Sequence, residues 1–130
     1  MKLPVFSVII PAHNEEIYIG ETIESILAQT FKNFEIIVVN DNSQDNTKII
    51  AAEYAKRDKR VRVIDVEKGS AAGSRNAGAK IAKGKYLLFQ DADCIADKNL
   101  LQNALPYLSH ASGVATRTAA AEPIPSIIVS

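Results

Sequence analysis

The sequence predicts an α/β fold in which helices cover both faces of one doubly wound, mostly parallel sheet, giving three layers. Strand-like apolar runs alternate along the chain with segments of helical periodicity. Those runs are almost continuously apolar, which is typical of parallel strands buried on both faces. The chain has 130 residues, 47% of them hydrophobic, which suits one small domain with a real core. The alternation therefore indicates right-handed βαβ units on a single sheet.

Five strands are expected from the apolar runs. The first covers residues 6–10 and is followed by Pro11, which lacks the N–H that a strand would use. The next three cover residues 34–39, 61–64 and 86–89, and a fifth begins at residues 113–115.

Four helices are expected between or after these strands. The first presents one apolar stripe, formed by Ile19, Ile23, Ile26 and Leu27. The second contains Ile49 and Ile50, with Asp45 or Thr47 as its N-cap. The third covers residues 73–82, whose small side chains allow close approach of backbone or ligand. The fourth covers residues 100–108, with Asp97 as its cap.

Composition excludes several classes of function. Fifteen basic and fifteen acidic residues give a net charge of zero, so no basic field for nucleic acid is present. Aromatic residues make up 6% with no Trp, which argues against a stacking platform for single strands. A single cysteine, Cys94, excludes an internal disulfide framework and a cysteine-based zinc site. With no apolar run near the ~20 residues of a membrane span, we expect a cytoplasmic location or one at the cytoplasmic face of the membrane.

Four polar clusters follow the predicted strands. They cover residues 11–16, 40–45, 69–76 and 90–93. The carboxyl ends of parallel strands lie at one edge of a sheet, which is where ligands bind in open α/β folds. One such cluster could be an ordinary turn, but four together predict a single ligand site.

The Asp91-Ala92-Asp93 triplet is the most specific of these features. On an extended segment, a spacing of two directs both carboxylates to the same side. Two adjacent negative charges favour a cation, and Mg²⁺ or Mn²⁺ can also accept phosphate oxygens. The alternative is a turn whose aspartates cap the backbone. Cys94, beside this pair, is expected to be structural, because neighbouring negative charge disfavours its thiolate.

Arg75 and Asn76 are expected to open the third helix. A helix start offers free N–H groups and a positive dipole end, and Arg75 adds a planar fork of donors for phosphate. The alternative is an exposed arginine near a loop. The segment matches neither a Walker A loop nor a dinucleotide-binding fingerprint.

Two further residues suit a nucleoside. Asp41, at the end of the second strand, can accept hydrogen bonds from a base imide or a ribose, or it can simply form a turn. His13 can lay its ring against a base or lie exposed in its loop.

Taken together, the segments SVIIPAHNEE, FEIIVVNDNSQDNT, GSAAGSRNAG and YLLFQDAD resemble the family 2 glycosyltransferases. The resemblance covers residues 4–117, with the four motifs in the family's order. It implies a GT-A fold, with residues 1–117 as a nucleotide-sugar-binding half-domain and residues 118–130 as an apolar tail.

The resemblance also implies roles for individual residues. The loop from Pro11 to Glu15 lines the nucleoside, Asp41 reads the base, and Asp91 and Asp93 contact the ribose and a Mn²⁺ or Mg²⁺ ion that bridges the diphosphate. The donor-binding residues implied are Pro11, Ala12, His13, Glu15, Asp41, Gly69, Arg75, Asp91 and Asp93, with Asp93 and Asp91 as metal ligands.

The implied function is binding of a nucleoside-diphospho-sugar, a UDP-sugar by preference, for inverting transfer to an unknown acceptor, glycan or lipid-linked. Family members carry an acceptor half and a catalytic base, whereas here the residues after Asp97 include only Glu122, in surroundings that do not match the base. We therefore expect donor binding without efficient transfer, and a homo-oligomer that covers the apolar surface of residues 100–108 and 127–129.

Two alternatives stay open. The chain could be a non-catalytic, self-associating remnant of a glycosyltransferase fold. It could also be a signalling receiver domain, with Asp65 as the phosphorylated residue, but no Lys follows Val114 where a receiver needs one.

Overall fold

The structure is a computed structural model that describes residues 3–108 and 127–129. Its elements run, in chain order, β1 (Phe6–Ala12), α1 (Ile19–Leu27), β2 (Phe34–Asp41), α2 (Thr47–Arg57), β3 (Val61–Val66), α3 (Ala71–Ile81), β4 (Tyr86–Phe89), α4 (Leu100–Leu108) and β5 (Ile127–Val129). Within those ranges, no helix is both long enough and apolar enough to cross a membrane.

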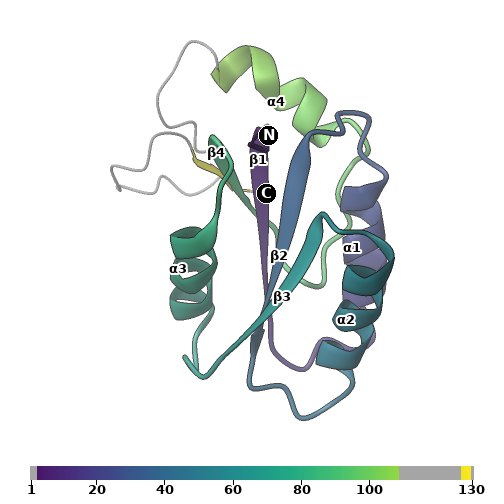
Figure 1. Cartoon of the computed structure of the whole chain (residues 1–130), viewed down its shortest axis with the longest axis vertical. Helices are drawn as coiled ribbons and strands as arrows, with labels where there is room; N and C mark the ends of the chain where they lie inside the picture. Colours follow the sequence, from purple (N-terminus) through teal and green to yellow (C-terminus); the bar gives the residue numbers. More distant parts are fainter. Residues whose placement is uncertain (1–2, 109–126, 130) are drawn as a thin grey trace.

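The strands form one parallel sheet in the order β3-β2-β1-β4-β5, with β1 at its centre (Figure 1). The expected parallel sheet is therefore confirmed. The strand expected at residues 113–115 lies outside the described residues. Within the expected tail, Ile127–Val129 pairs with β4 instead and forms the fifth strand.

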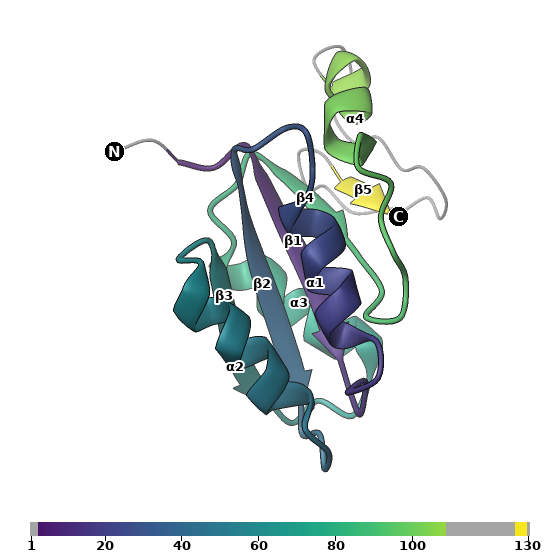
Figure 2. The same cartoon turned by 90° about the vertical axis from the view of Figure 1, so that its right-hand side faces the viewer.

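Helices cover both faces of the sheet, as predicted. Helix α3 lies on one face, while α1 and α2 lie on the other (Figures 1 and 2). Successive residues of β1 alternate between the two faces: Phe6, Val8 and Ile10 pack with α1, and Ile9 packs with α3. All four are fully buried, so each face of the central strand contributes to its own apolar core.

Strand β1 continues through Pro11 to Ala12, which corrects the expectation that Pro11 ends it. The Ile9 carbonyl accepts a hydrogen bond from Gln90, so Ile9 faces the β4 side. Residues two apart in a strand face the same side, so Pro11 faces that side too, beyond the last pairing with β4 at Phe89. No ladder bond is lost there, and the proline is tolerated.

A buried polar network lies at the amino ends of the strands. Ser7 donates to Glu35 at 2.6 Å and accepts from the Gly84 amide at 2.7 Å. Glu35 also accepts from Arg62 and from the Lys83 amide. This network joins β1, β2, β3 and the segment before β4 at the edge opposite the polar clusters.

Candidate functional site

The carboxyl ends of β1, β2, β3 and β4 surround a cavity of about 750 Å³. That volume is in the range of small-molecule sites. From β1 and its loop it is lined by Pro11, Ala12, His13 and Glu15, and from β2 by Asp41. Gly69 lines it from the segment after β3, and Asp91 and Asp93 from the segment after β4. The structure thus brings together eight of the nine residues expected in the donor site; the ninth is Arg75.

The loops after β1 and β2 are joined to each other by hydrogen bonds. The Asn14 amide donates to Ser43 Oγ, and the Gln44 amide donates back to Asn14 Oδ1 at 2.7 Å. Asn14 has a φ of +54°, in the left-handed region that asparagine tolerates. Farther along, the Glu15 amide donates to Thr47 Oγ1 at 2.8 Å. Each loop therefore holds the other, and the wall of the cavity is preorganised.

His13 is held at both ring nitrogens. Nδ1 lies 2.6 Å from the Asp41 carbonyl, which can only accept, so Nδ1 carries the proton. Nε2 lies 3.2 Å from Asn14 Nδ2. These contacts fix the plane of an exposed ring that lines the cavity.

The carboxylate of Asp41 binds the segment that follows β3. Oδ1 accepts from the amides of Lys68 and Gly69 at 2.8 and 3.2 Å. Oδ2 accepts from the Ser70 amide and the Ser74 hydroxyl, both at 3.2 Å. Burial alone would raise the pKa of Asp41, but these hydrogen bonds outweigh it and lower the pKa below its usual value. A carboxylate offers about four lone-pair sites, so a uracil imide would have to share or replace one of these donors.

Helix α3 begins at Ala71, earlier than the expected residue 73. Ser70 is its N-cap and accepts from the Gly73 amide at 3.0 Å. Arg75 therefore lies in the second turn, which corrects the expectation that it opens the helix. Its guanidinium lies 3.9 Å from Asp91 Oδ1, beside the cavity. Because both side chains are substantially exposed, this ion pair adds little stability.

Asp91 and Asp93 lie on a turn. Strand β4 ends at Phe89, and the Cys94 amide donates to the Asp91 carbonyl at 3.1 Å, closing a four-residue turn. The prediction that these residues lie on an extended segment is wrong, but the turn also brings the two carboxylates together. Ligand atoms of Asp91, Asp93 and Cys94 lie within 4.8 Å of one another.

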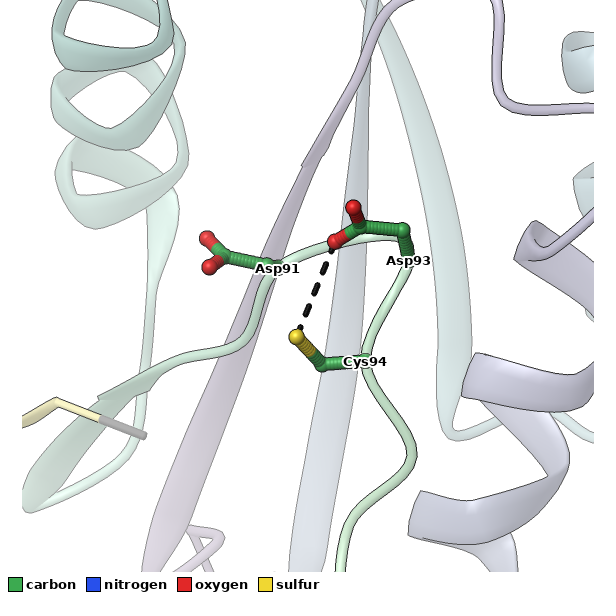
Figure 3. A group of neighbouring side chains, drawn as sticks. All are labelled: Asp91, Asp93 and Cys94. Atoms are coloured by element: carbon green, nitrogen blue, oxygen red, sulfur yellow. Dashed lines mark hydrogen bonds between the residues drawn. The ribbon is translucent and has the colours of Figure 1, made fainter.

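Figure 3 shows these three side chains, with Cys94 Sγ donating to Asp93 Oδ1 at 3.6 Å. The two carboxylates supply hard oxygen ligands of the type that Mg²⁺ and Mn²⁺ prefer. The residues present therefore fit a divalent cation. The Cys94 thiol lies within 4.8 Å of the carboxylate ligand atoms.

The cavity is electrostatically negative. Glu15, Asp41, Glu67, Asp91 and Asp93 line it against a single lysine, Lys68. Burial, followed by the charges of Asp93 and Asp45, raises the pKa of Glu15. An anionic ligand entering this space would need a cation to offset the repulsion.

Glu67 and Lys68 are cavity residues that the sequence reasoning missed. Both follow β3 directly, because β3 continues to Val66 rather than ending at residue 64. The signal was present: Val66 is apolar, and extending the third strand to it places the next two residues at the edge that carries the other clusters.

Comparison with known proteins identifies the family. The sequence model of glycosyl transferase family 2 matches residues 7–122. This chain belongs to that family. It is 43% identical over 100 residues to the uncharacterized glycosyltransferase EpsJ of Bacillus subtilis, covering 77% of this chain and 29% of that protein. It is 41% identical over 99 residues to the glycosyltransferase GlyG of Streptococcus pneumoniae, covering 75% of this chain and 33% of that protein.

Solved structures confirm the GT-A fold. TarS of S. aureus, residues 1–349 in complex with UDP, superposes with a TM-score of 0.76 at 30% identity, covering 90% of this chain and 38% of that one. The mannosyltransferase PcManGT of Pyrobaculum calidifontis, in complex with GDP-Man and Mn²⁺, gives 0.75 at 25% identity, covering 87% and 34%. Family membership excludes the receiver-domain alternative. The chain spans about a third of the length of the curated relatives described above.

Proposed function

We propose that this chain binds a nucleoside-diphospho-sugar, a UDP-sugar by preference, together with Mn²⁺ or Mg²⁺. The observation that carries the proposal is the cavity at the strand ends, with the Asp91 and Asp93 carboxylates on a closed turn at its wall. The fold is shared with TarS, which has been solved with UDP and with UDP-GlcNAc.

The charge of the cavity supports a metal-dependent mode of binding. A diphosphate carries negative charge into a space lined by five carboxylates. A divalent cation held by Asp91 and Asp93 would neutralise that charge and stabilise the departing nucleoside diphosphate as a Lewis acid. Arg75, 3.9 Å from Asp91, is placed to contact the same phosphates.

The part of the cavity lined by His13 and Asp41 suits the nucleoside. His13 presents a ring whose plane is fixed by contacts at both nitrogens, so little side-chain entropy is lost when a base stacks on it. Asp41 and the amides that it binds form the floor beside this ring.

For the whole protein we propose inverting transfer, in which an acceptor hydroxyl attacks the anomeric carbon and the nucleoside diphosphate leaves from the opposite side. The acceptor, a glycan or a lipid-linked glycan, and the catalytic base are not assigned. We also propose a cytoplasmic location, because both donor and metal are expected there.

Calorimetry tests the proposal directly. UDP should bind more tightly with Mn²⁺ or Mg²⁺ than with EDTA, and Asp93→Asn should lose most of that difference. Asp97→Asn is the matched control, because Asp97 lies on the same segment but accepts from the Asn99 amide and does not line the cavity. Titrations with CDP and GDP establish which base is preferred.

Equal UDP affinity with and without metal would contradict the metal site. A failure to bind UDP, CDP and GDP under every condition would contradict donor binding and leave the non-catalytic remnant as the better reading.

A further inference from the structure

Side chains of helix α1 form hydrogen bonds with the segment that carries the two aspartates. The Thr22 hydroxyl donates to the Ala92 carbonyl at 2.7 Å, in the turn between Asp91 and Asp93. Thr22 is fully buried, and Ala92 is 4% exposed. The contact is therefore shielded from water, and both of its partners lie in the interior.

The same face of α1 makes further contacts along this segment. Ser25 Oγ accepts from the Ala96 amide at 3.0 Å. Gln29, just after the helix, donates to the Asp97 carbonyl at 2.6 Å and accepts from the Leu101 amide at 3.0 Å. Thr22, Ser25 and Gln29 are spaced by three and four residues, which places them in one row.

The segment needs these contacts because it has no regular structure of its own. Residues 90–99, between β4 and α4, form neither helix nor strand. Buried backbone groups need hydrogen-bond partners, and here side chains of α1 supply them. A hydrogen bond from a helix 70 positions earlier in the sequence thus helps to fix the aspartate turn.

We propose that Thr22 is a positioning residue for the metal–diphosphate site. It fixes the carbonyl between the two aspartates, so that ligand atoms of both carboxylates stay within 4.8 Å of each other. This inference rests on the function proposed above. Helix α1 also follows the loop after β1, which lines the cavity. One helix is therefore connected to both that loop and the aspartate turn.

Two other contacts brace the turn but cannot replace Thr22. Gln90 Nε2 donates to the Cys94 carbonyl at 2.9 Å, and the Cys94 amide closes the turn onto Asp91. Both lie within the turn's own segment. Arg75 of α3 also reaches the turn, but only at the exposed side chain of Asp91. Among the hydrogen bonds of the described residues, that of Thr22 ties the backbone in the middle of the turn to another element.

The experiment compares Thr22→Val, which keeps the shape and removes the hydroxyl, with Thr22→Ser, which restores it. Ser7→Ala is the matched control, because it also removes a buried hydroxyl but at the opposite edge of the sheet. For each variant, the Kd for UDP is measured by calorimetry with Mn²⁺ and with EDTA. Hydrogen exchange of the Cys94 amide and urea unfolding are measured in parallel.

Thr22→Val should weaken Mn²⁺-dependent UDP binding on the order of tenfold, the effect typical of residues that orient metal ligands. Its affinity in EDTA should not change, and its Cys94 amide should exchange faster. Thr22→Ser should recover the wild-type values. Ser7→Ala should lose stability but keep both the metal dependence and the slow exchange of Cys94.

Three outcomes decide between the explanations. If wild-type protein shows no metal-dependent UDP binding, the proposed function fails, and the positioning role fails with it. If wild type binds but Thr22→Val matches it in affinity and exchange, the positioning role is overturned and the function stands. If Ser7→Ala weakens metal-dependent binding as much as Thr22→Val, the effect is general destabilisation and the positioning role is again overturned.

Discussion

Replacing Asp41 by Asn tests a carboxylate of the site that accepts four hydrogen bonds. The substitution keeps the shape but turns one acceptor into a donor and removes the charge. If Oδ1 still faces Lys68 and Gly69, the new amide NH₂ faces the Ser70 amide and the Ser74 hydroxyl. The hydroxyl can rotate to accept, but the Ser70 N–H cannot.

The magnitude follows from these contacts. One unsatisfied hydrogen-bond donor in a largely buried position lowers the stability by about 1–3 kcal/mol. The remaining hydrogen bonds no longer involve a charged acceptor, which lowers it by about 1 kcal/mol more. We therefore expect Asp41→Asn to lower the free energy of unfolding at pH 7 by about 2–4 kcal/mol. Asp65→Asn is the control: its carboxylate is 53% exposed, is paired with Lys48 and accepts from Asn40 Nδ2. The asparagine keeps an oxygen that can accept from Asn40, so the loss should be about 0–1 kcal/mol.

Urea unfolding measures stability, and a panel of nucleotides measures recognition on the same protein. If Asp41 reads uracil, Asp41→Asn should narrow or reverse the preference for UDP over CDP, because an amide can donate to cytosine N3. If Asp41 acts only by anchoring the segment after β3, the substitution should weaken the binding of UDP and of CDP by the same factor. A loss of less than about 0.5 kcal/mol, the range of ordinary surface substitutions, would refute the reasoning from hydrogen bonds.

Two further predictions concern stability. Burial raises the pKa of Asp41 and Asp45, but hydrogen bonds outweigh it at both; Asp45 accepts from the amides of Thr47 and Glu16. These bonds stabilise the folded state fully above the unfolded pKa of about 3.9, so the free energy of unfolding should fall as pH decreases through the lower folded values. Urea unfolding from pH 7 to pH 2 checks this, and a flat profile below pH 4 would contradict it. Gly84→Ala would place a Cβ 2.6 Å from the backbone nitrogen of Ser7 and should destabilise the protein by about 1–3 kcal/mol, measured by thermal unfolding, whereas a neutral result would show that the segment before β4 can shift.

The sequence predicted the fold because its signals are local. Near-continuous apolar runs at β1, β2 and β4 indicate buried parallel strands, and polar residues directly after each run indicate one edge of the sheet. That topology alone brings His13, Asp41 and Asp91 to one cavity, with no knowledge of side-chain contacts.

What the sequence did not predict are contacts between distant elements. The four donors on Asp41 come from residues 68–74, and the partner of the Ala92 carbonyl is Thr22 on another helix. Neither pairing leaves a periodic pattern. The predicted position of Arg75 is wrong for a local reason: Ser70 is a good N-cap, so α3 begins at Ala71, two residues before the expected residue 73.

These contacts also change how the site can hold a diphosphate. The N-terminus of α3 was expected to offer free N–H groups to phosphate, but the amides of Lys68, Gly69 and Ser70 donate to Asp41, and that of Gly73 donates to the Ser70 side chain. Three of these four amides precede the first helical residue and one lies in the first turn, so the first-turn amides of Ala71 and Ala72 are not among the committed donors. Since the cavity is also rich in carboxylates, a cation at Asp91 and Asp93 would supply positive charge that a diphosphate needs in addition to Arg75 and the two first-turn amides. Because Asp41 already binds the amides of residues 68–70, those amides are not free for a phosphate, which is one structural reason for the metal dependence that we propose.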